Sequence, residues 1–467
     1  VKEGDRVLFE RKITLFPVRP WVVYLLPHSH VDIGYTEVQT KVERDQWRFI
    51  ELAIEAAARS ADYPADARFK WNVEVLWAVD SYLRQADEAR KDAFVKAVRE
   101  GVIGLDALYG NELTALCRPE ELARLVDFAT RLSRDYGLTI DSAMISDVPG
   151  YTWGLMSVFG QAGIKYFSIG PNGGHRIGHT LRAWGDRAFR WQSPDGKHQV
   201  LCWVPRRGYY RGFLGGDQLL DYLSELQNSN YPYDLVQLRH CMGDNAPPEV
   251  AVSDFVKDWN TRFAHPRLVI STCSQMMRDF EARYGDSIPT VSGEFTPYWE
   301  DGEASSALET AMNRNSAERL SQAEALWAVL QPQAYPDEAF YQAWRNVLLY
   351  DEHTWGAHNS ITEPDSEFAQ SQWAIKRQFA VDGDQQSRAL LAAAVQGLAA
   401  DSPSAAVEVF NSCGWSRSGP VAIDVATAPA DVAVFDDSGK AVPQGRLADG
   451  RILFWAADVP AFGSRRF

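Results

Sequence analysis

Short apolar runs alternate with amphipathic stretches from about residue 21 to residue 290. Apolar runs of strand length predict buried strands at residues 21–27, 69–75, 103–108, 142–147, 166–170, 200–204, 235–242 and 268–272. Stretches with apolar residues at helical spacing predict helices at residues 46–61, 93–99, 120–136 and 274–284. This alternation is typical of repeated βα units, and about seven such units favour a barrel over a sandwich.

The pattern changes after residue 293. Long stretches with helical spacing follow at residues 306–330, 338–349 and 366–399, and short strand signals follow at residues 407–410, 421–425, 432–435 and 451–455. The prediction is an α/β protein with a seven-stranded βα barrel over residues 1–300. A three-helix bundle over residues 301–401 would complete the active site, and a small β region would occupy residues 402–467.

Composition excludes some classes of function. The chain has 467 residues and a net charge of −15, without a Lys/Arg stripe that could follow a phosphate backbone, which argues against nucleic acid. No apolar run approaches the roughly 20 residues that span a bilayer, so we expect a soluble protein without a membrane partner. Residues 1–4 do not read as a signal peptide. A periplasmic or secreted protein whose leader has been removed, and a homo-oligomer, stay open.

The cysteine and tryptophan content says less about function than the charge does. The five cysteines are scattered without metal-knuckle or redox spacing, so we expect free thiols. Sixteen tryptophans are many for a chain of this length, which suits a protein that stacks aromatic rings on sugars.

Two motifs at strand ends carry the candidate chemistry. His28, His30 and Asp32 follow the first apolar run and alternate, so an extended segment presents them on one side. Asp147 ends another run, and the loops after barrel strands build the active site. Imidazole nitrogen with carboxylate oxygen suits zinc, although another divalent ion is an alternative. The sequence predicts a metal site with His30, Asp32 and Asp147; a hydrated polar cluster and a turn at Asp147 are the competing interpretations.

A fourth ligand is expected from the helical region. Residues 351–358 read Asp-Glu-His-Thr-Trp-Gly-Ala-His and interrupt the helical pattern. His353 is the predicted ligand and His358 the alternative, because this segment would let the helical domain reach over the mouth of the barrel. A histidine that only caps a helix is the other interpretation.

Asp244 is the candidate general acid/base. It follows the apolar run at residues 235–241 within Gly-Asp-Asn, which would place it at the active-site end of the barrel. An aspartate that only starts a turn is the alternative.

Five further residues are predicted to bind substrate. Glu112 and Glu294 lie beside strand ends and could hold sugar hydroxyls, or form salt bridges instead. Tyr151 and Trp355 belong to the two segments that supply Asp147 and His353. His28 is expected either at the substrate or behind the ligands, where it would orient them.

Taken in order, these motifs resemble glycoside hydrolase family 38, the retaining α-mannosidases. The resemblance rests on Pro-His-Ser-His-x-Asp, Asp-x-x-Gly-Tyr and Gly-Glu-Phe, and on matching stretches at residues 313–319, 410–415 and 460–463. It implies a seven-stranded βα barrel, a three-helix bundle and a β-sandwich. The family's sandwich is much longer than the last 65 or so residues, so we expect a truncated or naturally short chain.

The resemblance also implies individual roles. His30, Asp32 and Asp147 match the family's zinc ligands, and Asp147 also matches its nucleophile. The family's fourth ligand lies in a His-Asp pair, whereas His353 is followed by Thr354 here.

The acid/base position departs from the family pattern as well. Where members carry Gly-x-Asp or Gly-Asp-Asp, this chain has Gly243-Asp244-Asn245. Asparagine in that position would impair ordinary hydrolysis, whereas Asp244 would preserve it.

These features predict a metal-dependent, retaining exo-glycosidase of the α-mannosidase type that acts on a glycan. One alternative keeps the fold and metal but cleaves another sugar, or performs β-elimination as a lyase. Another is a catalytically inactive carbohydrate-binding protein. Ligand-type residues at three separate strand ends argue against it, because a binding protein has no need for a nucleophile-like Asp147. The sugar and its linkage are not encoded in these motifs.

Overall fold

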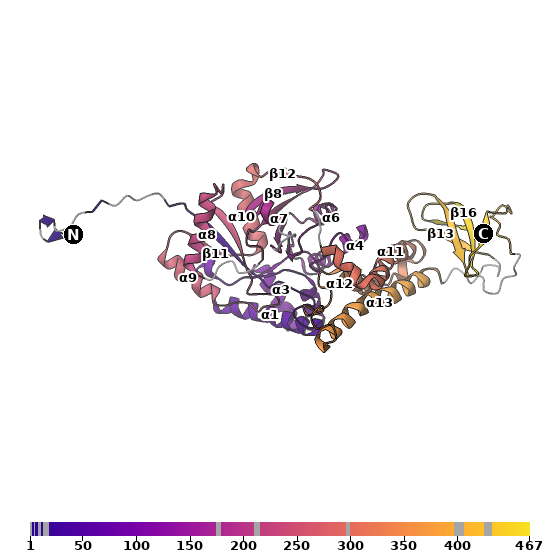
Figure 1. Ribbon diagram of the computed structural model, residues 1–467, viewed down its shortest axis with the longest axis horizontal. Helices are drawn as coiled ribbons and strands as arrows, with labels where there is room; N and C mark the ends of the chain where they lie inside the picture. Colours follow the sequence, from indigo (N-terminus) through magenta and orange to yellow (C-terminus); the bar gives the residue numbers. More distant parts are fainter. Residues whose placement is uncertain are drawn as a thin grey trace.

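The computed structural model describes residues 2–3, 5–7, 11–12, 18–173, 179–209, 215–295, 299–396, 406–424 and 432–467. Figure 1 shows a strand-rich part surrounded by helices, then a helical region, then a small β region. The ends of the predicted helix 366–399 and strand 421–425, and the predicted boundary at residues 401–402, lie outside the described residues. The division into three domains stays a prediction.

Apart from a short pair at the N-terminus, the described strands of the N-terminal part form three sheets. Parallel β3 (Val22–Pro27) lies between β10 (Leu235–His240) and β11 (Arg267–Ile270), and β4 (Trp71–Val73) pairs in parallel with β5 (Ile103–Leu105). The largest sheet has the order β12 (Thr290–Val291), β8 (Arg187–Gln192), β9 (Gln199–Val204), β7 (Tyr166–Pro171), β6 (Ser142–Asp147). A short antiparallel pair, β1 (Lys2–Glu3) and β2 (Arg6–Val7), precedes them.

Single bridges link these sheets. His28 pairs with Asn72, and Asp106 pairs with Ser142, so β3, β4, β5 and β6 follow one another in space. The mixed α/β class is confirmed. Closure into one seven-stranded ladder stays a prediction, because the described strands are joined between sheets only by such bridges.

Two details differ from the sequence-based expectation. Residues 187–192 form β8, antiparallel to β9, because Ala188, Phe189 and Trp191 are buried although charged residues interrupt them. The predicted helix at 120–136 is two helices, α4 (Pro119–Arg124) and α5 (Asp127–Tyr136). Helical spacing continues across this break, so the sequence pattern alone does not reveal it.

Helices cover the outside of these sheets (Figure 1). They are α1 (Gln39–Arg59), α2 (Trp77–Gln85), α3 (Glu88–Arg99), α4, α5, α6 (Leu155–Ala162), α7 (His179–Trp184), α8 (Gly216–Asn228), α9 (Val252–Arg262) and α10 (Cys273–Tyr284). Short 3-10 turns lie at Ala65–Ala67 and Gly285–Ser287. No described helix is both long and apolar enough to cross a membrane.

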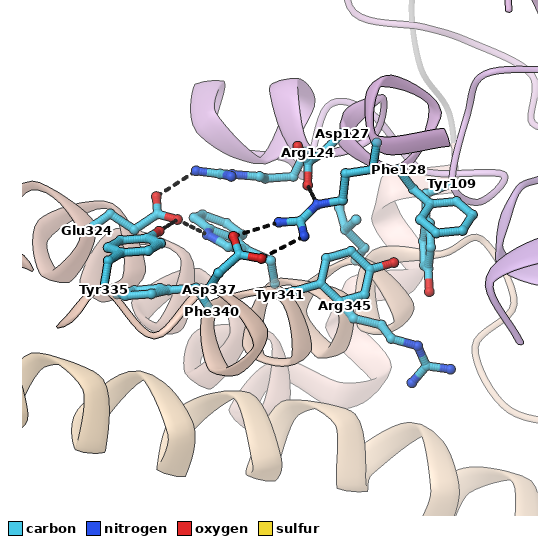
Figure 2. A pocket seen from close by; sticks show the side chains of 13 residues that line it. Tyr109, Arg124, Asp127, Phe128, Glu324, Tyr335, Asp337, Phe340, Tyr341 and Arg345 are labelled. Carbon is cyan, nitrogen blue, oxygen red and sulfur yellow. Dashed lines mark hydrogen bonds and ion pairs between the residues drawn. The ribbon is translucent and has the colours of Figure 1, made fainter. Parts of the chain in front are cut away.

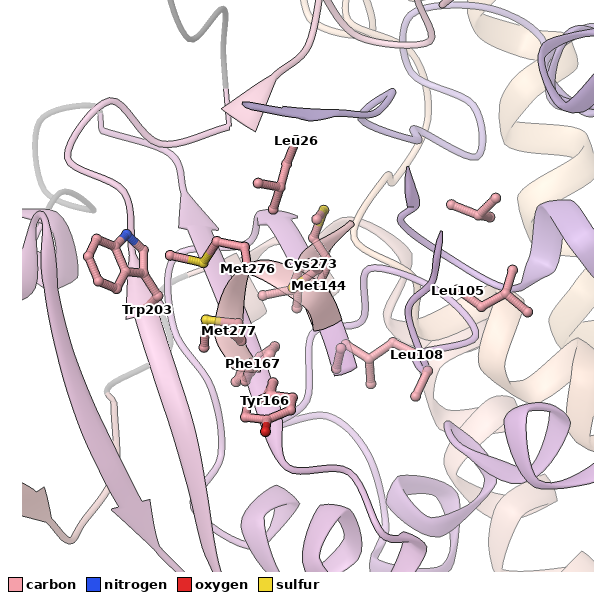
Figure 3. Packing of buried hydrophobic residues seen from close by; sticks show 14 of the residues in the cluster. Leu26, Leu105, Leu108, Met144, Tyr166, Phe167, Trp203, Cys273, Met276 and Met277 are labelled. Carbon is pink, nitrogen blue, oxygen red and sulfur yellow. The ribbon is translucent and has the colours of Figure 1, made fainter. Parts of the chain in front are cut away.

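The core between sheets and helices is apolar and tightly closed. Figure 3 shows Met144 and Phe167 from the sheet beside Met276 and Met277 of α10, and all four are fully buried. Burying side chains of this size stabilises the fold by about 1.5–3 kcal/mol each. Leu348, from the later helical region, belongs to the same cluster, so the two regions share a core.

The helical region consists of α11 (Ala307–Leu330), α12 (Asp337–Asp351) and α13 (Glu367–Val395), which pack against one another. The turns Trp299–Ser306 and Pro332–Ala334 precede α11 and α12. Figure 2 shows ion pairs that join this region to α4 and α5: Arg124 contacts Glu324 at 2.6 Å, and Arg131 contacts Asp337 at 2.9 Å. The helical region is therefore held against the N-terminal part by charge as well as by apolar packing.

The last strands form two small antiparallel sheets. They are β13 (Glu408–Asn411) with β17 (Gly463–Arg466), and β14 (Arg417–Ile423), β16 (Ile452–Val459) and β15 (Gln444–Arg446). A few buried residues, including Phe454 and Ile452, form their core.

Asp106, beside the bridge between β5 and β6, gives a pH prediction. Burial raises its pKa from 3.8 to about 7, although Ser142 donates a hydrogen bond to it at 2.8 Å. Between these values the folded protein binds more protons than the unfolded chain, so stability falls as pH rises. From pH 5 to pH 8 the protein should lose about 2–3 kcal/mol of unfolding free energy relative to Asp106→Asn, measured by urea denaturation. Parallel pH profiles would contradict this assignment.

Candidate functional site

Three buried side chains meet beyond the end of β3. His30 Nε2 lies 3.0 Å from Asp32 Oδ1, and His353 Nε2 lies 3.3 Å from the same oxygen. Both nitrogens are buried and make no hydrogen bond of good geometry with described residues. Two atoms bound tetrahedrally to one zinc ion at about 2.0–2.1 Å are about 3.3 Å apart. The spacing and the orphaned nitrogens fit a metal ion, with His30, Asp32 and His353 as ligands.

The charges around the two rings bear on how such an ion would bind. Burial alone would lower the pKa of His30, but Glu74 and Asp32 raise it well above its usual range. Glu352 and Asp32 overcome burial in the same way and raise the pKa of His353 to about 10. An ion must displace protons from the rings, so metal affinity should fall in acid.

Glu74, in the loop after β4, holds the first histidine pair. One of its oxygens lies 2.9 Å from His30 Nδ1, and the other lies 2.9 Å from His28 Nδ1. Asn111 donates to it at 2.7 Å, and Ser146 also bonds to it. A carboxylate behind a ligating histidine fixes the ring and directs Nε2 toward a metal. His28 therefore lies behind the candidate ligands.

Asp147 ends β6 in an uncommon backbone conformation. Its φ is 67°, which costs free energy in a residue other than glycine and marks candidate functional positions. Its Oδ1 accepts hydrogen bonds of 2.8 Å from Asn172 Nδ2 and Tyr209 Oη. Its Oδ2 lies 3.7 Å from His353 Nε2. The carboxylate is thereby held in a fixed orientation at the edge of the three-residue cluster.

His353 reaches this cluster from the end of α12. Its backbone N–H donates to the Asn111 carbonyl at 3.0 Å, and its Nδ1 lies 2.6 Å from Glu352 Oε1. Lys376 of α13 is buried and donates to the carbonyls of Leu349 and Glu352. The lysine closes the C-terminal end of α12 where backbone carbonyls lack helical partners. These bonds fix the histidine in position.

The cluster lies at one side of a cleft of about 630 Å³. Residues that line the cleft are Asp32, Tyr35, Asp147, Asn172, Tyr209, Asp244, Trp299, Asp301, Gly302, Ser305, His353, Thr354, Trp355 and Ile361. Trp299 stacks parallel to His353, with ring centres 6.2 Å apart. Aromatic rings beside carboxylates and hydroxyls suit a polar ligand with apolar faces, such as a sugar.

Asp244 and Asn245 occupy different environments. Asp244 lines the cleft that also contains Asp147. The amide of Asn245 instead donates to the Asp32 carbonyl at 3.0 Å and to Thr36 Oγ1 at 2.9 Å. The asparagine thus holds the loop that carries Asp32, and Asp244 is the titratable residue of the two that faces the cleft.

The five residues predicted to contact substrate lie in different environments. Trp355 lines the cleft. Glu294 is exposed, and it accepts hydrogen bonds from Thr152 Oγ1 at 2.8 Å and from the Trp153 N–H at 3.0 Å. These bonds give Glu294 a role in holding the loop after β6.

The other three lie deeper. His28, Tyr151 and Glu112 are at most 1% exposed, and none is among the described residues that line the cleft. The hydroxyl of Tyr151 donates to the Val148 carbonyl. A direct contact between these side chains and a substrate stays a prediction.

Sequence reasoning missed several residues of the site. Glu74 and Lys376 support the candidate ligands, and Tyr209 and Trp299 line the cleft. Glu74 lies at the second-to-last position of the apolar run predicted as a strand at residues 69–75, so a carboxylate near the end of a predicted strand was an available signal. Nothing in the local sequence distinguishes Lys376 from the other charged residues of a long helix.

Comparisons with known proteins agree with this architecture. Residues 20–301, more than half of the chain, match the family described as glycosyl hydrolases family 38 N-terminal domain. The chain therefore belongs to glycosyl hydrolase family 38. No curated protein matches at the sequence level.

Two solved structures resemble the fold. An alpha-mannosidase from Enterococcus faecalis V583 is 16% identical, with a TM-score of 0.67, and the match covers 96% of this chain and 56% of that one. A family 38 protein from Enterococcus faecalis is 15% identical, with a TM-score of 0.59 and coverage of 96% and 52%. This chain spans little more than half the length of either, and identities this low show the fold alone.

The bridge made by Glu74 can be tested directly. Glu74→Gln keeps the shape of the side chain but weakens its bonds to His28 and His30, so metal affinity should fall by about 10–100-fold. Competition with a fluorescent chelator measures the change. Glu88→Gln, which alters an exposed ion pair with Lys91, is the matched control and should bind metal normally. Equal affinity in both variants would contradict the assigned role.

Proposed function

We propose that this protein is a metal-dependent, retaining exo-glycosidase of the α-mannosidase type that acts on a glycan. The observation that carries the proposal is the position of Asp147, whose fixed carboxylate adjoins the cluster of His30, Asp32 and His353. Membership of family 38 and an alpha-mannosidase among the similar folds support the reaction class.

The proposed metal ligands are His30, Asp32, Asp147 and His353, and zinc suits their mixture of nitrogen and oxygen. When bound, such an ion would supply a Lewis acid that holds sugar hydroxyls beside the reacting carbon. The protein's own part is to fix the ligands. Glu74 orients His30, and Glu352 orients His353, through charged hydrogen bonds that exclude other ring positions.

Asp147 is the proposed nucleophile. Asn172 and Tyr209 orient its carboxylate through Oδ1, so the side chain need not reorganise when it attacks the anomeric carbon. Attack forms a bond from an aspartate oxygen to that carbon while the bond to the leaving oxygen breaks. Water then hydrolyses the glycosyl ester and restores Asp147.

Asp244 is the proposed general acid/base. It would protonate the leaving oxygen in the first step and take a proton from water in the second. Its place in the cleft supports this role, whereas the amide of Asn245 is committed to the backbone and cannot titrate. The departure from the family pattern is thereby compatible with hydrolysis.

A screen of aryl glycosides and mannose-containing oligosaccharides tests the proposal, with products followed by mass and by the anomer first released. We expect addition of water and retained configuration for α-mannosides, and no turnover by Asp147→Asn. An unsaturated product would favour the lyase alternative. Binding without any product would favour a carbohydrate-binding protein.

Asp244→Ala separates protonation from nucleophilic attack. An activated aryl group leaves without a proton, but a sugar alkoxide does not, so the variant should retain cleavage of aryl substrates and lose about 10²–10⁴-fold on natural linkages. Steady-state rates on both substrates measure the split. Asp301→Asn, another acidic position in the cleft, should affect both substrates alike. Wild-type rates on both substrates in Asp244→Ala would remove it from the mechanism.

A further inference from the structure

A second group of candidate ligands lies outside the cleft. The Cys117 sulfur and one carboxylate oxygen from each of Glu121 and Asp351 lie within 4.8 Å of one another. Cys117 precedes α4, Glu121 lies in α4, and Asp351 ends α12. The group thus joins the N-terminal part of the chain to the helix that carries His353.

The two carboxylates are held in fixed orientations. Glu121 accepts a hydrogen bond of 2.9 Å from the Arg118 N–H through Oε2, and Asp351 accepts one of 3.0 Å from Asn313 Nδ2 through Oδ1. Their other oxygens, Glu121 Oε1 and Asp351 Oδ2, are buried and receive no hydrogen bond from the described residues. Both residues are only 1% exposed. Each carboxylate therefore has one anchored oxygen, and its other oxygen is left for a ligand or for a proton shared between the two carboxyls.

The surrounding charge favours a cation. Among the described residues, neither Glu121 nor Asp351 forms an ion pair with Lys, Arg or His, although the charge of the buried Lys376, which pairs with Glu352, lowers the pKa of Asp351. Glu112, also buried, has two further oxygens without hydrogen bonds and adds to the negative potential at Cys117. Buried carboxylates without a direct ion pair are costly by several kcal/mol. An ion or a proton must offset this charge.

We propose that Cys117, Glu121 and Asp351 form a second, structural metal site that binds a divalent ion of the zinc class. Thiolate sulfur with carboxylate oxygen suits zinc or cobalt and does not suit magnesium or calcium, which prefer oxygen alone. Binding displaces the thiol proton and any proton on the carboxyls. The bound ion would fasten α4 to the end of α12, two residues before His353.

A shared proton is the competing occupant. Burial raises the pKa of both carboxyls, and Asp351 adds to the rise at Glu121. Burial also raises the pKa of the Cys117 thiol. A metal-free site would therefore hold protons, and a direct measurement of sulfur–metal bonding distinguishes the two states.

Titration of the metal-free, full-length protein with Co²⁺ provides that measurement. The cluster of His30, Asp32, Asp147 and His353 contains no sulfur, so a near-ultraviolet sulfur-to-cobalt charge-transfer band reports the second site alone. We expect this band in the wild-type protein and its loss in Cys117→Ser, together with one fewer bound cobalt per chain. Glu121→Gln, which can still accept the Arg118 N–H, should weaken cobalt binding at this site at least tenfold.

Cys241→Ser is the matched control. Its thiol contacts the His30 N–H at 3.4 Å and is the cysteine beside the first cluster, so the band should persist in this variant. Circular dichroism confirms that each variant is folded. A folded wild-type protein without the band, or a band that survives in Cys117→Ser, would overturn the proposal. Loss of hydrolysis with the band intact would instead count against the proposed function.

Discussion

The candidate site depends on one contact between distant parts of the chain, the pairing of residues 111–113 with residues 351–353. Glu112 and Glu352 form an antiparallel bridge, and the N–H of His353 donates to Asn111 at 3.0 Å. This pairing, together with the hydrogen bond from Thr354 Oγ1 to the Ile33 carbonyl at 3.0 Å, fixes His353 relative to Asp32. The shared apolar core and the buried Lys376 maintain it, because separating the two regions would expose both. The fold thus completes the site by joining two regions of the chain, because neither region alone contains all of the candidate ligands.

Charge compensation beneath the site extends this constraint into the interior. Arg239 is 1% exposed, and its Nη1 donates to Ser146 Oγ at 2.6 Å. Ser146 in turn bonds to Glu74, which holds His28 and His30. A buried guanidinium and a buried carboxylate are tolerable because hydrogen bonds connect Arg239, Ser146, Glu74 and His30. The same hydrogen bonds orient the His30 ring, which faces Asp32. The packing of the interior therefore determines the geometry of the candidate ligands.

Many of the candidate site residues could be predicted from local sequence patterns. Apolar runs ending in His30, Asp32 and Asp147 identify strand ends, and the structure brings these side chains to one edge together with His353. The supporting residues could not be found this way, because Lys376 acquires its role only when α13 packs behind α12. Whether Asp244 or Asn245 faces the cleft likewise depends on tertiary structure. The hydrogen bond from the Asn245 amide to the Asp32 carbonyl joins distant residues, so the local motif does not reveal it. Local sequence patterns locate strand ends. The residues that support the candidate ligands, and the residue that can donate a proton, are determined by packing between distant parts of the chain.

We propose that His30, Asp32, Asp147 and His353 bind one divalent ion. The most direct test is a crystal structure of the zinc-loaded protein, with anomalous diffraction recorded on both sides of the zinc absorption edge. We expect an anomalous peak at the cleft within bonding distance, about 2.0–2.2 Å, of His30 Nε2, His353 Nε2 and a carboxylate oxygen of both Asp32 and Asp147. A fully loaded protein with no peak between these four residues, or with a cleft ion bound by His358 and not by His353, would contradict it.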